Sequence, residues 1–535
     1  MLSYRKLAMR VLGRPLHTEG IDSPRPASQR AAAFILTAAM LTTLAAPAFA
    51  DIWHIENGDI TISAGESGNN VTQNNNTTYG DTNTIITNQN KDTASSHTVT
   101  IEAKDKDDKV EVTLKDVNID TSSRNKAAVS VTGEGDTNIK LDGDNALKSD
   151  IYRSGIYGSG SGSLTISGGE NDSLTAQGGS GANGISSSGS LTISGGTVTA
   201  NGDDGGRGIS SSGSVTISGG STVTANGGSG TISGGDGICS SGGVTISGGS
   251  TVTANGGNGG SLVGGDGIRS DGGVTISGGT VKAAGGDSKD GYGGDGIRSG
   301  GGVTISGNTV NAAGGNGGKV GGYGICSFDR VAISGGTVEA AGGNGSTGGG
   351  SGIYSSVIDL SGSLELTAKA GSPNGKALSQ KGSELVLDTI KDKLGPGAKV
   401  TATDADGKVI DQVSTPRPVE PEESSSSSDG GSAAPSAPAS PLPGLTVTDK
   451  DGQRISYTST QSGNTLTVCV GRLTASFRIS LAALRQLRAE GIETIAFQTV
   501  LCSTTLSVDE LLAMGGENAE AVLTHRFTDS SLTVG

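Results

Sequence analysis

The sequence predicts an all-β protein: a right-handed parallel β-helix, then a linker and a small α+β domain. A Gly-Ile unit recurs eight times at intervals of 24 to 30 residues, with its isoleucine at Ile156, Ile185, Ile209, Ile238, Ile268, Ile297, Ile325 and Ile353. A fixed period of this length is typical of a solenoid. Short runs of β-branched residues such as VTIS alternate in polarity, as strands do. Aromatic residues make up only 3% of the chain and 93 residues are glycine, which indicates a narrow core.

Each coil of about 28 residues is expected to contain three short strands. In one coil these strands begin at Ile268, at the VTIS run of 274–277 and at the VKAA run of 281–284. Coil-to-coil pairing would place equivalent residues about 4.8 Å apart, with isoleucine, valine, leucine and alanine stacked inward. The usual handedness of parallel crossovers predicts a right-handed coil.

Residues 1–50 have the pattern of an export signal. Basic residues precede an apolar run at 31–46, and Ala48-Phe49-Ala50 supplies the small-x-small cleavage pattern. The apolar run is short for a membrane span, and no second one follows. We expect a bacterial protein that is secreted or held at the cell surface, with an uncleaved N-terminal anchor as the alternative.

The elements of the solenoid follow in order. Residues 51–150 are expected to form an N-terminal cap and the first coils, because solenoid ends need caps. Residues 151–390 are the glycine-rich β-helix repeats, and residues 391–415 form a terminal hairpin that turns at Asp406-Gly407. Outside the repeats, strands are predicted at 59–63, 98–103, 110–119, 127–131, 363–370 and 383–389.

The composition changes after the repeats. Residues 416–444 are a Pro/Ser/Ala linker of the disordered kind. Residues 445–535 are expected to form a small α+β domain, with helices at 480–491 and 507–514, that docks to a surface partner. Cys469 and Cys502 of this domain could pair with each other. Cys239 and Cys326 lie three coils apart, beyond disulfide reach, and should be free thiols or pair between molecules.

The charge of the chain excludes some partners. The formal net charge is −15, and the first 50 residues contain six basic and only two acidic residues, so the remainder is more acidic still. Such a protein would release no counterions from phosphates, which disfavours nucleic acid. The acidity is compatible with bound cations.

Three aspartates of consecutive coils are candidate metal ligands. Asp236, Asp266 and Asp295 each stand two residues before an inward isoleucine, and stacked carboxylates would repel one another. A Ca²⁺ ion bound through oxygen at 2.3–2.6 Å would bridge adjacent coils. The alternative is that each aspartate is only a turn former before glycine. The equivalent position in other coils is occupied by Ser154, Asn183, Arg207, Tyr323 and Ser351.

Two arginines are candidates for binding substrate. Arg269 and Arg298 follow the inward isoleucine of neighbouring coils, so they should stack and point outward. A guanidinium suits a uronate carboxylate. The alternative is that these arginines pair with the nearby aspartates.

The repeat resembles a known family. Segments reading VTLKDVNID, AAVSV and GDGIRSDGGVTISGGTVKA are similar to secreted bacterial carbohydrate-binding β-helix proteins of the polygalacturonate-binding type, whose architecture is that of polysaccharide lyases. The resemblance covers roughly residues 98–360. It implies calcium as cofactor and an acidic polysaccharide as partner.

Three functions compete at this stage. The leading prediction is non-catalytic, calcium-assisted binding of an acidic polysaccharide by the stacked face. The second is a polysaccharide lyase, in which Arg269 or Arg298 would abstract a proton. The third is a structural adhesin or surface repeat protein. Whether the protein is an enzyme stays open, with binding preferred because fold similarity alone does not give activity.

Overall fold

The computed structural model describes residues 51–416 and, with short gaps, residues 445–534. The chain divides into two compact units, Met1–Glu422 and Glu423–Gly535. The predicted signal at 1–50 and nearly all of the predicted linker lie outside the described residues. Among the helices that are described, none combines the length and apolar character needed to cross a membrane.

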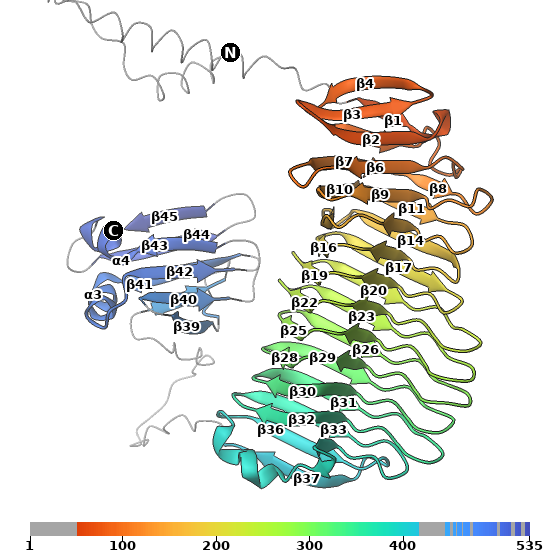
Figure 1. Cartoon of the computed structure of the whole chain (residues 1–535). Coiled ribbons are helices and arrows are strands. Elements are labelled where there is room, and N and C mark those ends of the chain that lie inside the picture. Colours follow the sequence, from red (N-terminus) through yellow and green to blue (C-terminus); the bar gives the residue numbers. More distant parts are fainter. Residues whose placement is uncertain are drawn as a thin grey trace, which may run out of the picture. The chain divides into compact units, whose positions relative to one another are not determined.

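The first unit is a parallel β-solenoid, which confirms the predicted fold class. It has about 13 turns of roughly 28 residues each, stacked as Figure 1 shows. The strand that carries the Gly-Ile unit forms one column: β6 (Val99–Ala103), β9 (Val129–Gly133), β12 (Ile156–Gly158), β15 (Ile185–Ser187), β18 (Ile209–Ser211), β21 (Ile238–Ser240), β24 (Ile268–Ser270), β27 (Ile297–Ser299) and β34 (Leu378–Gln380).

Two further columns complete each coil. The second contains β7 (Lys109–Lys115), β10 (Asp136–Asp142), β13 (Leu164–Ser167), β16 (Leu191–Ser194), β19 (Val215–Ser218), β22 (Val244–Ser247), β25 (Val274–Ser277) and β28 (Val303–Ile305). Two long strands, β30 (Ile325–Ile333) and β32 (Ile353–Leu360), run through the first and second columns. The third contains β8 (Asn118–Asp120), β11 (Asp144–Lys148), β14 (Ser173–Ser180), β17 (Thr197–Asp203), β20 (Thr222–Asn226), β23 (Thr251–Asn255), β26 (Thr280–Ala284), β29 (Asn308–Ala313), β31 (Gly336–Ala341), β33 (Leu364–Lys369) and β36 (Lys399–Thr403).

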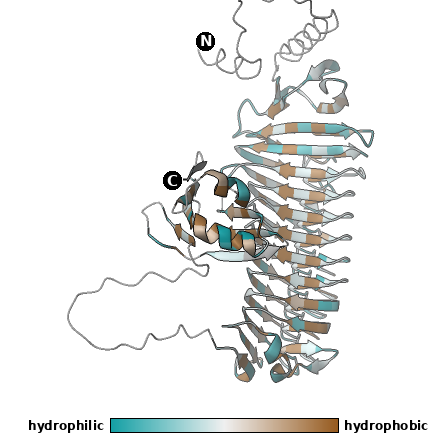
Figure 2. Ribbon diagram, turned by 90° about the vertical axis from the view of Figure 1, so that its left-hand side faces the viewer, coloured by the Kyte–Doolittle hydropathy of each residue, from teal (hydrophilic) through white to brown (hydrophobic). Residues whose placement is uncertain are grey.

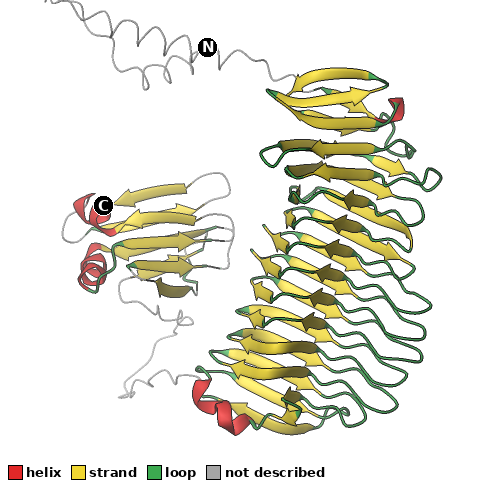
Figure 3. Ribbon diagram, viewed as in Figure 1, coloured by secondary structure: helices red, strands yellow, loops and turns green. Residues whose placement is uncertain are grey.

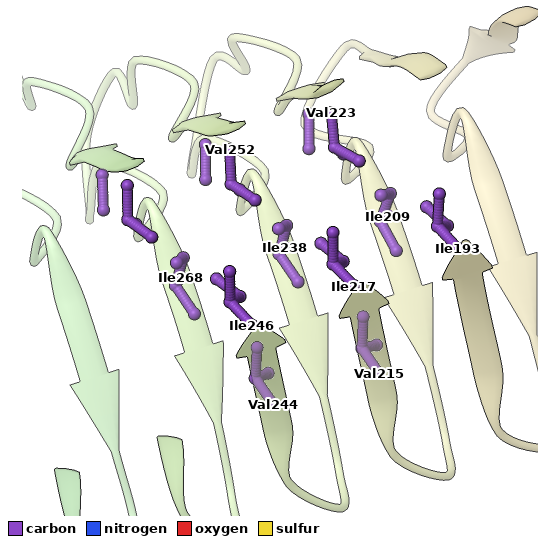
Figure 4. Close-up of a cluster of buried hydrophobic side chains, with 14 of the residues drawn as sticks. Ile193, Ile209, Val215, Ile217, Val223, Ile238, Val244, Ile246, Val252 and Ile268 are labelled. Carbon is purple, nitrogen blue, oxygen red and sulfur yellow. The ribbon is translucent and has the colours of Figure 1, made fainter. Parts of the chain in front are cut away.

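The core is a set of side-chain stacks, drawn in Figure 4. The eight isoleucines of the Gly-Ile units are all fully buried, as predicted. Ile238 pairs in register with Ile268, and Ile268 with Ile297. The valines and alanines of the other two columns meet these isoleucines in one continuous cluster. Figure 2 shows the same apolar positions lining up from coil to coil.

Both ends of the solenoid finish in antiparallel strands. At the N-terminus β1 (Ile52–His54) and a short 3-10 helix η1 (Ile55–Asn57) precede β2 (Ile60–Gly65), β3 (Gly68–Gln73), β4 (Asn76–Asp81) and β5 (Thr84–Thr87). Strand β3 is antiparallel to both β2 and β4. At the other end β37 (Val409–Ser414) pairs antiparallel with β36, after a turn in which Gly407 has a φ of +84°. These hairpins close the stack.

Glycine pairs pack the loop edge, which Figure 3 shows as long connections. Two glycine tracks interleave there: Gly257 donates to the carbonyl of Gly235, Gly265 to Gly257, and Gly286 to Gly265, each at 2.8 Å. A Cβ on Gly265 would lie 1.9 Å from the oxygen of Gly235. These glycines are therefore required for close backbone packing, in addition to making turns.

Three sequence expectations differ in detail. The run at 110–119 breaks into β7 and β8 because Asp116, with a φ of +49°, turns the chain between them. Residues 383–389 form only β35 (Ser383–Glu384) before a 3-10 helix, η2 (Leu387–Lys393), which buries Leu387 and Ile390 three residues apart. Cys326 follows an inward isoleucine as Arg298 does, so the same alternation predicts that it points outward. It is nevertheless buried, because it lies in register between the longer side chains of Arg298 and Tyr354.

The second unit is β-rich with two short helices. One sheet contains β38 (Leu445–Thr448), β41 (Ala475–Ser480), β44 (Glu520–His525) and β45 (Ser530–Val534). The other contains β39 (Thr458–Ser462), β40 (Thr465–Cys469), β42 (Thr494–Gln498) and β43 (Ser503–Ser507).

The predicted helices of this unit are confirmed as α3 (Leu481–Ala489) and α4 (Val508–Met514). The Ser480 hydroxyl accepts from the amide of Ala483 and caps α3. Cys469 is a free thiol, and its predicted partner Cys502 lies outside the described residues. Cys239 and Cys326 are also free, as expected.

Candidate functional site

A groove of about 750 Å³ runs across several coils at the glycine-rich edge of the solenoid. Val263, Tyr292 and Val320 line one side, and they are linked by isolated parallel bridges. All five predicted site residues line the groove, namely Asp236, Asp266, Asp295, Arg269 and Arg298. Pairs of glycines connect the two sides in each coil. The structure therefore brings the predicted metal and substrate residues to one place.

The three aspartates form a ladder with the backbone of the next coil. Oδ1 of Asp236 accepts from the amide of Asp266 at 2.9 Å, and Oδ1 of Asp266 accepts from that of Asp295 at 2.7 Å. Oδ1 of Asp295 accepts from the amide of Tyr323 at 2.7 Å. Asn183, which occupies the same column two coils before Asp236, likewise accepts the amide of Arg207 through its Oδ1 at 2.8 Å. A neutral amide can therefore make this contact, so the negative charge at the three positions needs another explanation.

The second carboxylate oxygens have different partners. Oδ2 of Asp236 accepts from Nε of Arg207 at 3.2 Å, and Oδ2 of Asp295 accepts from Nη1 of Arg298 at 3.3 Å. Oδ2 of Asp266 accepts no hydrogen bond from the described residues, although Asp266 is only 6% exposed. The central aspartate of the three thus has an oxygen without a donor, and this oxygen is not among the described unpartnered atoms that are closed to solvent, so it is accessible from the groove.

The two arginines of the prediction also differ. They pair in register on β24 and β27, as expected. Arg298 is half-buried, bound to Asp295, and lies over the ring of Phe328 at 5.3 Å. Arg269 is exposed and forms no ion pair with any described residue. The alternative in which an arginine pairs with an aspartate therefore applies to Arg298 only.

Burial and like charge shape the titration of the carboxyls. Burial and the charges of Asp295 and Asp236 raise the pKa of Asp266 well above its usual value. Burial also raises the pKa of Asp295 to about 6, against the opposing effect of the Tyr323 amide and Arg298. Burial alone would lower the pKa of Arg298, but the charges of Asp295 and Asp266 raise it overall. Arg298 is therefore a poor proton acceptor, which counts against its use as a catalytic base.

Aromatic rings border the groove. Tyr292 is 55% exposed on one side. Tyr323 occupies the aspartate position of its coil and stacks on Tyr354, with ring centroids 4.9 Å apart. Such rings offer flat apolar faces beside charged groups, a composition common in ligand-binding grooves.

The fit to calcium is poor on this geometry. Within the described part of the chain, no group of three or more His, Cys, Asp or Glu side chains is arranged to hold a metal ion. The three Oδ1 atoms accept backbone amides, and two of the three Oδ2 atoms face guanidinium groups. Only one carboxylate oxygen is left for a cation that takes 6–8 oxygen ligands.

Sequence reasoning missed two residues of the groove. Arg207 and Tyr323 were noted only as departures from the aspartate column, yet Arg207 binds Asp236 and Tyr323 donates its amide to Asp295. The sequence contained a signal for both residues, because their places in the aspartate column put Arg207 next to Asp236 and Tyr323 next to Asp295 in the stack. The ladder contacts to backbone amides had no signal in the sequence.

Comparisons of the chain with protein-family models, curated proteins and solved structures gave no match. Fold and groove therefore define the class: a parallel β-solenoid with a polar groove built from equivalent positions of consecutive coils. The resemblance to carbohydrate-binding β-helix proteins is confirmed for architecture only.

Proposed function

We propose that this protein is a non-catalytic carbohydrate-binding solenoid that holds an acidic polysaccharide in its groove. The observation that carries this proposal is Arg269, an exposed guanidinium in the groove that forms no ion pair among the described residues. A guanidinium is a planar double donor that matches a carboxylate. A uronate residue of the polymer would supply that carboxylate.

The form of the groove supports a polymeric ligand. Its lining residues come from equivalent positions of successive coils, which follow one another about every 4.8 Å. An extended chain of sugars lying across the coils would meet similar groups repeatedly. Tyr292 and Tyr323 would contact the apolar faces of its rings. Export, as expected from residues 1–50, would bring the protein to such a polymer.

Calcium distinguishes two forms of the proposal. In the form we prefer, Arg269 binds the carboxylate directly, because the aspartates already have backbone and arginine partners. In the calcium-assisted form implied by the family resemblance, a cation would bridge the aspartates and the polymer. Both forms place the ligand in the same groove.

The test is isothermal calorimetry of the full chain with polygalacturonate and with its methyl ester, which keeps the backbone but removes the charge. We expect binding of the acid and about tenfold or more weaker binding of the ester. Arg269→Gln should lower the affinity for the acid by a similar factor. Arg153→Gln is the matched control, since Arg153 is exposed and bonds to Asn125 outside the groove.

Each opposing outcome has a distinct meaning. Loss of binding in chelator would favour the calcium-assisted form. Equal binding of acid and ester would exclude recognition of the carboxylate. Formation of an unsaturated product that absorbs in the ultraviolet would show a lyase. Failure to bind any glycan, with adhesion to cells retained, would favour a structural adhesin.

A further inference from the structure

The three central coils of the groove differ in the partner of the second carboxylate oxygen of their aspartate. In two of them the second carboxylate oxygen has an arginine partner: Arg207 for Asp236 and Arg298 for Asp295. In the coil between them, Oδ2 of Asp266 accepts no hydrogen bond from a described residue, and Arg269 forms no ion pair with one. One free acceptor and one free double donor thus belong to the same coil, three residues apart.

The state of Asp266 is unfavourable without a ligand. Its side chain is only 6% exposed, and it lines the groove. Burial of a charged carboxylate is unfavourable unless its oxygens have hydrogen-bond partners. Oδ2 is not among the described unpartnered atoms that are closed to solvent, so it remains accessible from the groove. A ligand that donates a hydrogen bond to Oδ2 would supply the partner that no described residue provides.

The chemistry of the two groups is complementary to a sugar acid. Asp266 accepts hydrogen bonds and repels anions, whereas Arg269 donates and attracts them. A sugar hydroxyl can donate to Asp266, and a uronate carboxylate can accept from Arg269. A polymer that presents only carboxylates would be repelled at Asp266, and a neutral polymer would leave Arg269 without its charged partner.

We propose that Asp266 and Arg269 together select a uronate residue with a free hydroxyl group, which Asp266 binds by accepting its hydrogen. This inference rests on the proposed function and names the feature of the acidic polysaccharide that is recognised. Asp266 is then the specificity-determining residue of the groove. Blocking the ring hydroxyls, as O-acetylation does, should remove the donor and leave the ligand's carboxylate unchanged.

The experiment compares polygalacturonate with its O-acetylated form by calorimetry. We expect the wild-type chain to bind the acetylated polymer about tenfold more weakly, a loss of about 1.4 kcal/mol. In Asp266→Asn the Oδ1 atom still accepts the amide of Asp295, but a donor replaces the acceptor Oδ2. The difference between the two polymers should fall to about threefold or less in this variant.

The control is Asp287→Asn, in an exposed second ladder where Oδ1 of Asp287 accepts from the amide of Asn316. It should keep the wild-type preference. Equal affinity of the wild type for both polymers would overturn the inference and leave acidic-polysaccharide binding intact. Absence of binding to either polymer would overturn both. Circular dichroism establishes that Asp266→Asn is folded before its binding is interpreted.

Discussion

At the scale of single residues, the aspartate column combines a structural contact with a charge. The contact to the next coil needs only an oxygen, because Asn183 makes it as well as Asp236 does. The charge brings a cost: Asp266 is buried, and the pKa values of Asp266 and Asp295 are raised. The proposed role of Asp266 in ligand recognition explains why this position has a charged residue although burial of the charge is unfavourable.

This cost leads to a prediction for stability against pH. A raised pKa means that the folded state holds its proton more tightly than the unfolded state does. The contribution of these two carboxyl groups to stability is therefore greatest below the unfolded pKa of 3.8, and it is lost as the pH rises through their folded pKa values, which for Asp295 is about 6. Asp266→Asn removes a charge and keeps the ladder contact. It should raise the melting temperature by about 2–5 °C at pH 7.5 and by little at pH 4.

Thermal melts at both pH values measure this effect. Asp287→Asn makes the same chemical change in the exposed ladder and should alter the melting temperature by less than about 1 °C at either pH. A lower melting temperature for Asp266→Asn at pH 7.5 would mean that the charge of Asp266 stabilises the fold, contrary to this account.

At the scale of elements, the positions in the two interleaved glycine tracks restrict the type of residue as strongly as the buried strand positions do. Gly265→Ala would place a Cβ 1.9 Å from the oxygen of Gly235, so the backbone of neighbouring coils must move. We expect a loss of about 1–3 kcal/mol or more in unfolding free energy. Gly302→Ala is the matched control, because its Cβ would meet the nearest atom, the oxygen of Arg330, at 3.5 Å.

Urea denaturation of the two variants gives the comparison. The urea midpoint of Gly265→Ala should fall clearly, and the unfolding free energy of Gly302→Ala should stay within about 0.5 kcal/mol of that of the wild type. Similar midpoints for both would show that the glycine edge yields to a side chain.

The glycine tracks also show which features of the fold can be predicted from the sequence and which cannot. The isoleucine period predicts the coils and the core, because a column needs one residue type at one spacing, as Ile238, Ile268 and Ile297 have. The isoleucine period does not predict the hydrogen bond from the amide of Gly265 to the carbonyl of Gly257, because that contact joins the two sides of a loop. The same limit applies to the candidate site. The repeat period predicts that Arg269 and Arg298 occupy neighbouring positions of one column. It does not predict which partners Asp266 and Asp295 have, because these contacts depend on side-chain positions.

At the scale of the whole solenoid, the ends need protection more than the sides. Every interior strand pairs with the coil before and after it, so unpaired backbone groups would occur only in the first and last coils. Both ends are closed by antiparallel strands with a register shift: between Asn69 and Val71 in β3, and between Ala402 and Thr403 in β36. Such irregularities twist an edge away from further pairing. The hairpins therefore keep the stack from extending into a neighbouring molecule.

Removing one hairpin strand tests this role. A chain of residues 51–403 lacks β37 and exposes the edge of β36, whereas a chain of residues 51–416 keeps both strands. We expect the shorter chain to self-associate through that edge and the longer chain to remain a monomer at the same concentration. Light scattering after size-exclusion chromatography measures the masses, and circular dichroism confirms that β structure is retained. A folded, monomeric 51–403 chain would mean that the edge of β36 does not need β37 to prevent self-association.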